Sequence, residues 1–134
     1  MEVDQNNLTA KHDLGAIESV LGNFHNARKY FVDAINQNIS NYKSFKNYIE
    51  ITNINEKDSI FKKLKEIPTE NETAQNQIDI YYSLSKGYFD KGDKKEGFKN
   101  LEKGKKIKKN FSNFSIKREK KQFKNLKDYF NNHN

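Results

Sequence analysis

Two segments of the chain carry the same pattern of large and small residues, at a spacing typical of paired helices. Residues 8–41 and 78–111 are each 34 residues long. Large apolar and small residues recur at the same offsets in both, in the pairs Leu14 and Leu84, Gly22 and Gly92, Ala27 and Gly97, Phe31 and Leu101, and Ala34 and Gly104. A unit of this length cannot bury its apolar face alone, so neighbouring copies stack. The repeat therefore predicts an all-α array of helix hairpins.

The small residues of the repeat have a structural meaning in such a hairpin. Gly22 and Gly92 fall at the predicted turn, where a residue without Cβ lets the backbone reverse direction at low cost. Ala27 and Gly97 lie on the second helix, where a small side chain lets the two helices approach closely. Phe31 and Leu101, the large apolar pair, fill the gap one turn further along this helix.

Residues 42–77 form a degenerate middle copy. Apolar residues at helical spacing predict a first helix around Phe45 to Ile49 and a shorter second helix around Ile60 to Leu64. Residues 53–56 are the predicted turn between them. Pro68 ends the second helix, because proline lacks a backbone donor and restricts the residue before it. The predicted hairpins therefore cover residues 8–41, 42–77 and 78–111.

A last helix is predicted over residues 115–130. Residues 110–113 indicate a break after the third hairpin, and Ser115 is a candidate N-cap. One side of this helix is apolar, with Ile116, Phe123, Leu126 and Phe130, and its other side is basic. Helical arrays need a terminal element with a polar outer face, so we interpret the segment as a capping helix. A single domain then spans residues 8–131, with tails over 1–7 and 132–134.

The positive charge is concentrated towards the C-terminal end. The chain has 25 Lys+Arg against 18 Asp+Glu, a formal net charge of +7, but the first 77 residues carry slightly more acids than bases. Between residues 103 and 127 Glu119 is the one acid. A candidate basic patch comprises Lys103, Lys105, Lys106, Lys108, Lys109, Lys117, Arg118, Lys120, Lys121 and Lys124. A solvated lysine-rich face explains such a run, and a polyanion-binding module using residues 103–127 is the alternative. Because arginine is scarce, nucleic acid is not favoured as a partner, although it stays open.

Several function classes find no support in the sequence. Zero cysteines exclude disulfides and thiolate chemistry. No window approaches about 18 consecutive apolar residues, so we expect no membrane partner. The N-terminus lacks the features of a secretory signal, so we expect a cytoplasmic protein. The three histidines stand in no metal-binding arrangement, and no catalytic triad or phosphate cradle occurs, so we expect no metal, no cofactor and no enzyme activity.

The 34-residue period and its conserved offsets resemble the tetratricopeptide repeat (TPR), on the residues Leu14, Gly15, Gly22, Ala27, Phe31 and Ala34. That resemblance implies a right-handed superhelix of about three hairpins plus the capping helix. The segment from Tyr81 to Asp93, with Gly97 to Gly104 after it, is similar to the last repeat of bacterial TPR proteins that often carry a C-terminal sulfotransferase domain. The phosphate-binding loop of that enzyme has no counterpart in this sequence. The resemblance therefore implies the scaffold and not the activity.

In TPR arrays the first helix of each hairpin lines a concave groove. In that register, the candidate partner-binding groove comprises His12, Lys43, Lys46, Asn47, Glu50, Tyr82, Lys86 and Phe89. Lysines mixed with aromatics suit an acidic peptide in an extended form, although Tyr82 and Phe89 can instead pack between hairpins. We thus predict a non-catalytic protein–protein interaction scaffold. The detached scaffold of a TPR–sulfotransferase system, docking a separate catalytic domain, is an alternative, and the partner and the oligomeric state are left open.

Overall fold

The computed structural model describes residues 5–132, with side chains from Thr9 onward. The described residues form six helices: α1 (Gln5–Val20), α2 (Phe24–Gln37), α3 (Tyr42–Glu50), α4 (Ser59–Lys65), α5 (Ala74–Asp90) and α6 (Lys94–Asn132). No strand occurs among these residues, so the predicted all-α class is confirmed. The predicted tails fall partly outside the described range. Within that range α1 already begins at Gln5, inside the segment expected as a tail over residues 1–7.

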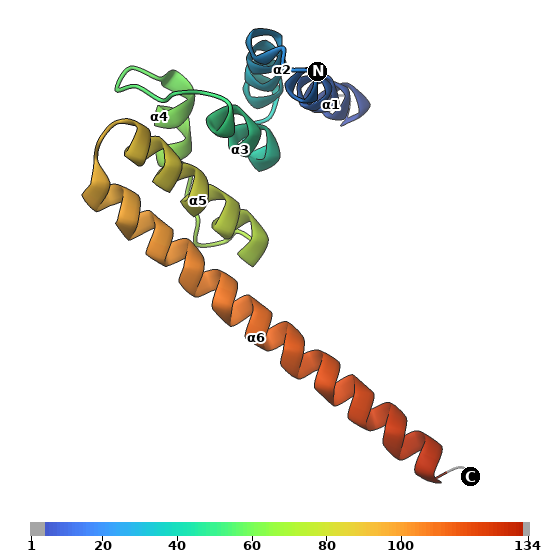
Figure 1. Ribbon diagram of the computed structural model, residues 1–134. Coiled ribbons are helices and arrows are strands. Elements are labelled where there is room, and N and C mark those ends of the chain that lie inside the picture. The colour runs from blue at the N-terminus through green and yellow to red at the C-terminus, as the bar shows by residue number, and fades with distance from the viewer. Residues whose placement is uncertain (1–4, 133–134) are drawn as a thin grey trace.

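Two helix pairs lie on either side of a middle part formed by α3 and α4. α1 packs against α2, and α5 packs against α6. Between these two hairpins, α3 contacts α2 on one side and α5 on the other, while α4 contacts both α3 and α5. Figure 1 shows the resulting order, with α1 and α2 at one end and α6 at the other. α3 therefore connects the N-terminal helix pair to the C-terminal one.

The two turn glycines have the conformation that the repeat predicts. Gly22 and Gly92 both have a φ of +82°, in the left-handed region that favours glycine. In the first turn the amide of Gly22 donates to the carbonyl of Ser19 over 3.1 Å, and the amide of Asn23 donates to Glu18 over 2.8 Å. The equivalent amides of the second turn make the same two bonds, at 3.0 Å and 2.9 Å. Both helices therefore end in the same Schellman motif.

The second helix of the middle copy, α4, is the shorter one, as predicted, and a single carboxylate organises its start. The Oδ1 atom of Asp58 caps α4 by accepting the amides of Ile60 and Phe61, at 2.9 Å and 3.0 Å. Its Oδ2 atom accepts the hydroxyl of Tyr48 at 2.9 Å, which ties α4 to α3. Burial and this bond to a carboxylate together raise the pKa of Tyr48 to about 12. α4 ends at Lys65, before Pro68.

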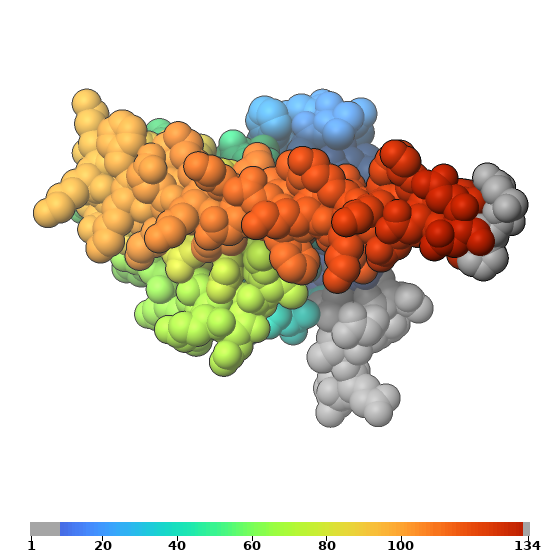
Figure 2. Space-filling model, turned by 90° about the horizontal axis from the view of Figure 1, so that it is seen from below, coloured from blue at the N-terminus to red at the C-terminus, as the bar shows by residue number. Residues whose placement is uncertain are grey.

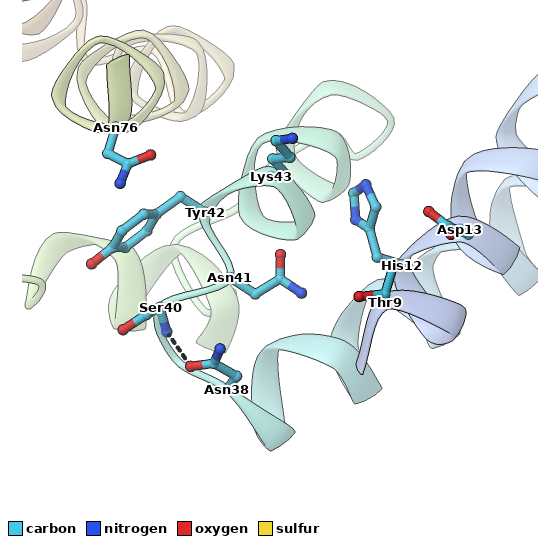
Figure 3. Close-up of a pocket in the computed structure, with 9 residues that line it drawn as sticks. All are labelled: Thr9, His12, Asp13, Asn38, Ser40, Asn41, Tyr42, Lys43 and Asn76. Carbon is cyan, nitrogen blue, oxygen red and sulfur yellow. Dashed lines mark hydrogen bonds between the residues drawn. The ribbon is translucent and has the colours of Figure 1, made fainter. Parts of the chain in front are cut away.

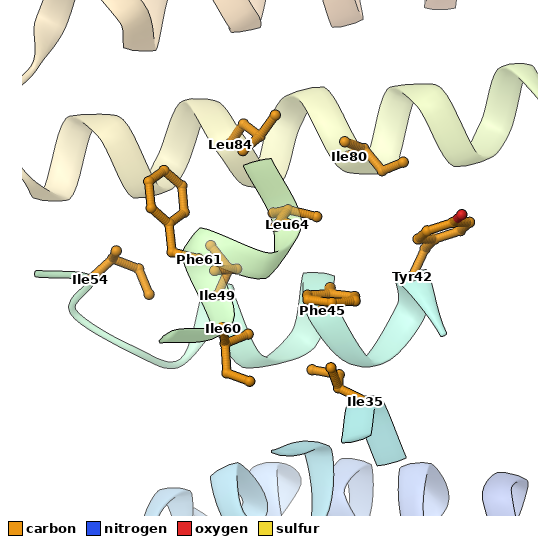
Figure 4. Close-up of a cluster of buried hydrophobic side chains, with 10 residues drawn as sticks. All are labelled: Ile35, Tyr42, Phe45, Ile49, Ile54, Ile60, Phe61, Leu64, Ile80 and Leu84. Atoms are coloured by element: carbon orange, nitrogen blue, oxygen red, sulfur yellow. The ribbon is translucent and has the colours of Figure 1, made fainter. Parts of the chain in front are cut away.

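The hydrophobic core lies where α3 and α4 meet α5 (Figure 4). Its buried side chains are Ile35, Tyr42, Phe45, Ile49, Ile54, Ile60, Phe61, Leu64, Ile80 and Leu84. Most come from the degenerate middle copy and from the helix that packs on it. A core of this size needs few apolar residues, in agreement with a chain that is 34% hydrophobic.

Aromatic rings pack directly on glycine backbones at four places. The ring of Phe31 on α2 lies over Gly15 of α1, where a Cβ would be only 2.6 Å from a ring carbon. The ring of Phe61 on α4 lies over Gly87 of α5 in the same way. Two rings of α5, those of Tyr82 and Phe89, face Gly104 and Gly97 of α6. The close helix approach predicted at Gly97 is therefore confirmed.

The C-terminal part of the chain differs from the prediction. α6 continues unbroken from Lys94 to Asn132, so the break at 110–113 and the separate capping helix over 115–130 are wrong. Asn and Ser lower helix propensity only slightly, and no Gly or Pro follows Gly104, so the helix continues. From Lys117 to Asn132 every side chain is exposed, so this segment does not cap the core. Figure 1 shows it extending beyond the other helices.

We predict that Gly15→Ala destabilises the wild-type protein but not a Phe31→Leu variant. In the wild type the added methyl meets the Phe31 ring, and overpacking of this kind costs about 1–3 kcal/mol. Replacing a glycine inside a helix contributes about 1 kcal/mol in the opposite direction, and this gain remains when the ring is removed. Urea unfolding of the wild type, both single variants and the double variant gives the coupling free energy. Additive free-energy changes would contradict the contact between ring and backbone.

Candidate functional site

Two neighbouring cavities lie along the side of the molecule that includes α1, α3 and α5. The first has a volume of about 480 Å³ and lies between α1, the start of α3 and the start of α5 (Figure 3). Its lining is polar and consists of Thr9, His12, Asp13, Asn38, Ser40, Asn41, Tyr42, Lys43 and Asn76. Side-chain amides and one lysine therefore face this space together with an imidazole.

The second cavity, of about 350 Å³, lies between α3, α5 and α6. It is lined by Lys46, Gln75, Ile78, Asp79, Tyr82, Lys108, Phe111 and Ser112. Lys43 lines the first cavity and Lys46 the second, and residues three apart on a helix lie on the same side. These two lysines place the two cavities on the same side of α3, and we name the two cavities together the α3 groove.

His12 and Ser44 form a polar contact beside the α3 groove. The Nδ1 atom of His12 lies 2.8 Å from the Oγ atom of Ser44, and the imidazole packs at 5.6 Å from the Phe31 ring. A His–Ser pair can activate a nucleophile, but Ser44 is fully buried. A substrate cannot reach its hydroxyl. The pair therefore attaches α1 to the first turn of α3, where Asn41 caps the helix by accepting the Ser44 amide.

The imidazole of His12 is disfavoured in its charged form. Burial is the largest cause that lowers the pKa of His12 below its usual 6.5; the Asp13 carboxylate opposes this shift, and Lys43 adds to it. The neutral imidazole is therefore the form that the folded protein favours. Lys43 is left as the nearby cation of the first cavity.

Four of the predicted groove residues line the α3 groove: His12, Lys43, Lys46 and Tyr82. They come from α1, α3 and α5, the first helices of the three hairpins. Of the other predicted residues, Asn47 is half-buried and Glu50 is exposed, and both lie on α3 without lining either cavity.

Lys86 and Phe89 have structural roles instead. The Nζ atom of Lys86 donates to the Thr52 carbonyl at 2.5 Å and pairs with the Asp90 carboxylate, which also accepts the Ile54 amide at 3.1 Å. These bonds hold the loop between α3 and α4 on α5. Phe89 packs on α6, where its ring meets the Phe98 ring edge-on at 5.0 Å. Neither side chain lines the α3 groove.

Sequence reasoning missed several residues that line the α3 groove. Asn41 and Asn76 reach it from the N-terminal ends of α3 and α5, and Lys108 and Phe111 reach it from α6. The N-cap pattern at Asn41, ahead of an apolar helix, was a signal that could have placed it near a helix end. No comparable signal marks Lys108 and Phe111, because they face the groove only through the pairing of α6 with α5.

The predicted basic patch follows α6 along its length and is not one compact surface. Two of its members lie over aromatic rings of α5: Lys103 is 5.6 Å from the Tyr81 ring centre, and Lys108 is 6.0 Å from that of Tyr82. All ten patch side chains are exposed.

Within residues 5–132 no group of three or more metal-ligating side chains comes together. No helix in this range is both long and apolar enough to cross a bilayer.

Comparisons with known proteins return no relative. No protein-family model matches the chain, and neither the curated proteins nor the solved structures include a match. The functional argument therefore depends on the residues and geometry described above.

We predict that His12 makes the stability of the fold depend on pH. Because its pKa is lower in the folded state than in the unfolded chain, the unfolded chain binds the proton more readily. The contribution is fully present above pH 6.5 and is lost as the pH falls through the lowered pKa. Urea unfolding at several pH values should therefore show a smaller acid-side loss for His12→Gln than for the wild type. His25→Gln, a change at an exposed residue, is the matched control and should keep the wild-type slope.

Proposed function

We propose that the protein is a TPR-like interaction scaffold that binds an extended acidic peptide in the α3 groove. The observation that carries the proposal is the meeting of His12, Lys43, Lys46 and Tyr82 along one groove, from three successive hairpins. Concave surfaces of this kind are the usual binding surfaces of helical repeat arrays. The equal turns at Gly22 and Gly92 support the TPR-like register, because the same helix ending recurs at equivalent positions.

The chemistry of the groove suits a peptide backbone with acidic side chains. Lys43, Lys46 and Lys108 supply three cations along it against the two carboxylates of Asp13 and Asp79, so the lining stays net positive, and charge-assisted bonds from lysine to carboxylate are stronger than neutral ones. The side chains of Asn41 and Asn76 border the first cavity, and amides can both donate to and accept from a peptide backbone. Because the two cavities follow each other across α1, α3, α5 and α6, an extended ligand fits better than a compact one.

The apolar residues of the second cavity give the peptide an anchor. Ile78, Tyr82 and Phe111 line that cavity next to Lys46 and Lys108. An aromatic or aliphatic side chain of the ligand can be buried there while its carboxylates face the lysines. Burial of one anchor in a pocket, with charged contacts around it, is the common arrangement of peptide recognition.

Site-specific photo-crosslinking tests the proposal directly. A photoreactive residue at position 46 lies between the two cavities, whereas one at position 62 on α4 is exposed and lines neither. We expect a specific protein to be captured from source-cell extract at position 46 and not at position 62. Capture of a sulfotransferase domain would instead favour the detached-scaffold role. Recovery of no specific protein from the folded chain would count against an interaction scaffold.

We predict that Lys43→Glu combined with Lys46→Glu weakens binding of the captured peptide by about 1–3 kcal/mol, because two attractive contacts become repulsive. The matched control, Lys29→Glu with Lys62→Glu, makes the same charge change on α2 and α4 and should leave the affinity within about 0.5 kcal/mol. Calorimetry with the synthetic peptide measures both. Equal losses in the two double variants would mean that net charge, and not the groove, determines binding.

A further inference from the structure

We propose that the exposed second half of α6 lies on an anionic phospholipid surface, with its apolar side in the headgroup region and its lysines against the lipid phosphates. This inference concerns a surface separate from the α3 groove and goes beyond the proposed peptide binding. The earlier expectation of no membrane partner was based only on the lack of a spanning segment. A helix that lies in the interface needs no such segment.

The segment has two chemically distinct sides. Ile116, Phe123 and Phe130 recur every seven residues, and Leu126 lies between the last two, so these four side chains share one side of the helix. All four are exposed, Phe123 to 71%. Lys117, Lys121 and Lys124 lie on the other side, while Lys120 and Lys127, three and four residues from Phe123, border the apolar side; all five are exposed. Exposed apolar side chains in one row, bordered by cations, are the pattern of an interfacial helix.

The position of the segment leaves both sides accessible. Figure 2 shows α6 extending along one face of the molecule, and Figure 1 shows its C-terminal part extending beyond the other helices. From Lys117 to Asn132 no side chain is buried or half-buried by the rest of the chain. These residues span about 24 Å of helix, which is enough to lie across several lipid headgroups.

Charge complementarity favours an anionic lipid surface over the other occupants. A nucleic acid would neutralise the lysines, but it would leave Phe123, Leu126 and Phe130 in water. A second copy of the chain would cover these side chains, but it would bring two lysine-rich helices together. A lipid surface satisfies both sides at once, because cations are attracted to the phosphates while apolar side chains enter the acyl boundary. Glu119 lies on the apolar side, so we place the inserted part at residues 123–130.

A tryptophan probe tests the proposal in the full-length chain, which contains no Trp of its own. Positions 123 and 125 lie about 200° apart around the helix, so Phe123→Trp faces the apolar side and Asn125→Trp faces away from it. Neither change alters the charge. With vesicles of phosphatidylcholine and phosphatidylglycerol at low salt, we expect a blue-shifted emission for Phe123→Trp and little shift for Asn125→Trp. With phosphatidylcholine alone, we expect no shift for either.

The charged side is tested by co-sedimentation with the same vesicles. Each lysine near an anionic surface strengthens binding about fivefold, so Lys121→Glu with Lys124→Glu should weaken it at least 25-fold. Phe123→Ser with Phe130→Ser keeps the charge but should abolish binding, because it removes the apolar side chains that enter the lipid. Glu119→Gln should strengthen binding severalfold. Circular dichroism and urea unfolding should be unchanged in all three variants, because these side chains do not touch the core.

Four other results would overturn the proposal. Equal binding to neutral and anionic vesicles would show that the lysines play no part. Absence of vesicle binding, with salt-sensitive binding to duplex DNA that Phe123→Ser with Phe130→Ser leaves intact, would identify a polyanion surface. Concentration-dependent dimers that this same variant abolishes, without vesicle binding, would identify a second copy as the occupant. Equal blue shifts at positions 123 and 125 would exclude an oriented helix. Failure of peptide binding in the α3 groove would leave all these measurements unaffected.

Discussion

The contact between aromatic rings and bare glycine backbone is the interaction on which the stack of helices depends. Phe31 lies over Gly15 and Phe61 lies over Gly87, so close that a Cβ at either glycine would collide with the ring. Each ring is buried, and each joins two different helices. A single ring on a glycine removes a large apolar area from water with only one large side chain. Contacts of this kind join α1 to α2, α4 to α5 and α5 to α6, and the small core joins α3 to its neighbours.

The parts of the fold that the sequence predicted are those that local chemistry decides. A φ of +82° strongly favours glycine, so Gly22 and Gly92 determined the two turns. The continuous helix α6 could not be predicted in the same way. Its polar residues at 110–115 are common at breaks, but inside a helix each costs only a few tenths of a kcal/mol. The sequence therefore distinguished poorly between a break and a continuous helix. The repeat pattern favoured the break, which was wrong.

The sequence could predict those residues of the candidate site whose position along a helix alone decides which way they face. His12, Lys43 and Lys46 face the α3 groove because of their positions on α1 and α3. Lys86 lies on α5 at a position equivalent to those groove positions of α1 and α3. Its ammonium group, however, bonds to the Thr52 carbonyl and the Asp90 carboxylate and does not face the groove. The partner carbonyl belongs to a loop that reaches α5 only in the folded protein. Periodicity cannot reveal such a contact, because the two residues are far apart in the chain and neither belongs to a repeat pair.

α6 gives the two proposed surfaces a fixed geometric relation. Its 39 residues extend about 58 Å as one helix, with its N-terminal part packed on α5 and its C-terminal part exposed. Lys108 and Phe111 border the α3 groove, and the row of exposed apolar side chains begins at Ile116, within two turns of Phe111. A helix without an internal break does not let these two regions rotate independently. Docking of the exposed half on a lipid surface would therefore set the orientation of the α3 groove, and of any peptide in it, relative to that surface. This requires no conformational change, since the helix itself transmits the orientation.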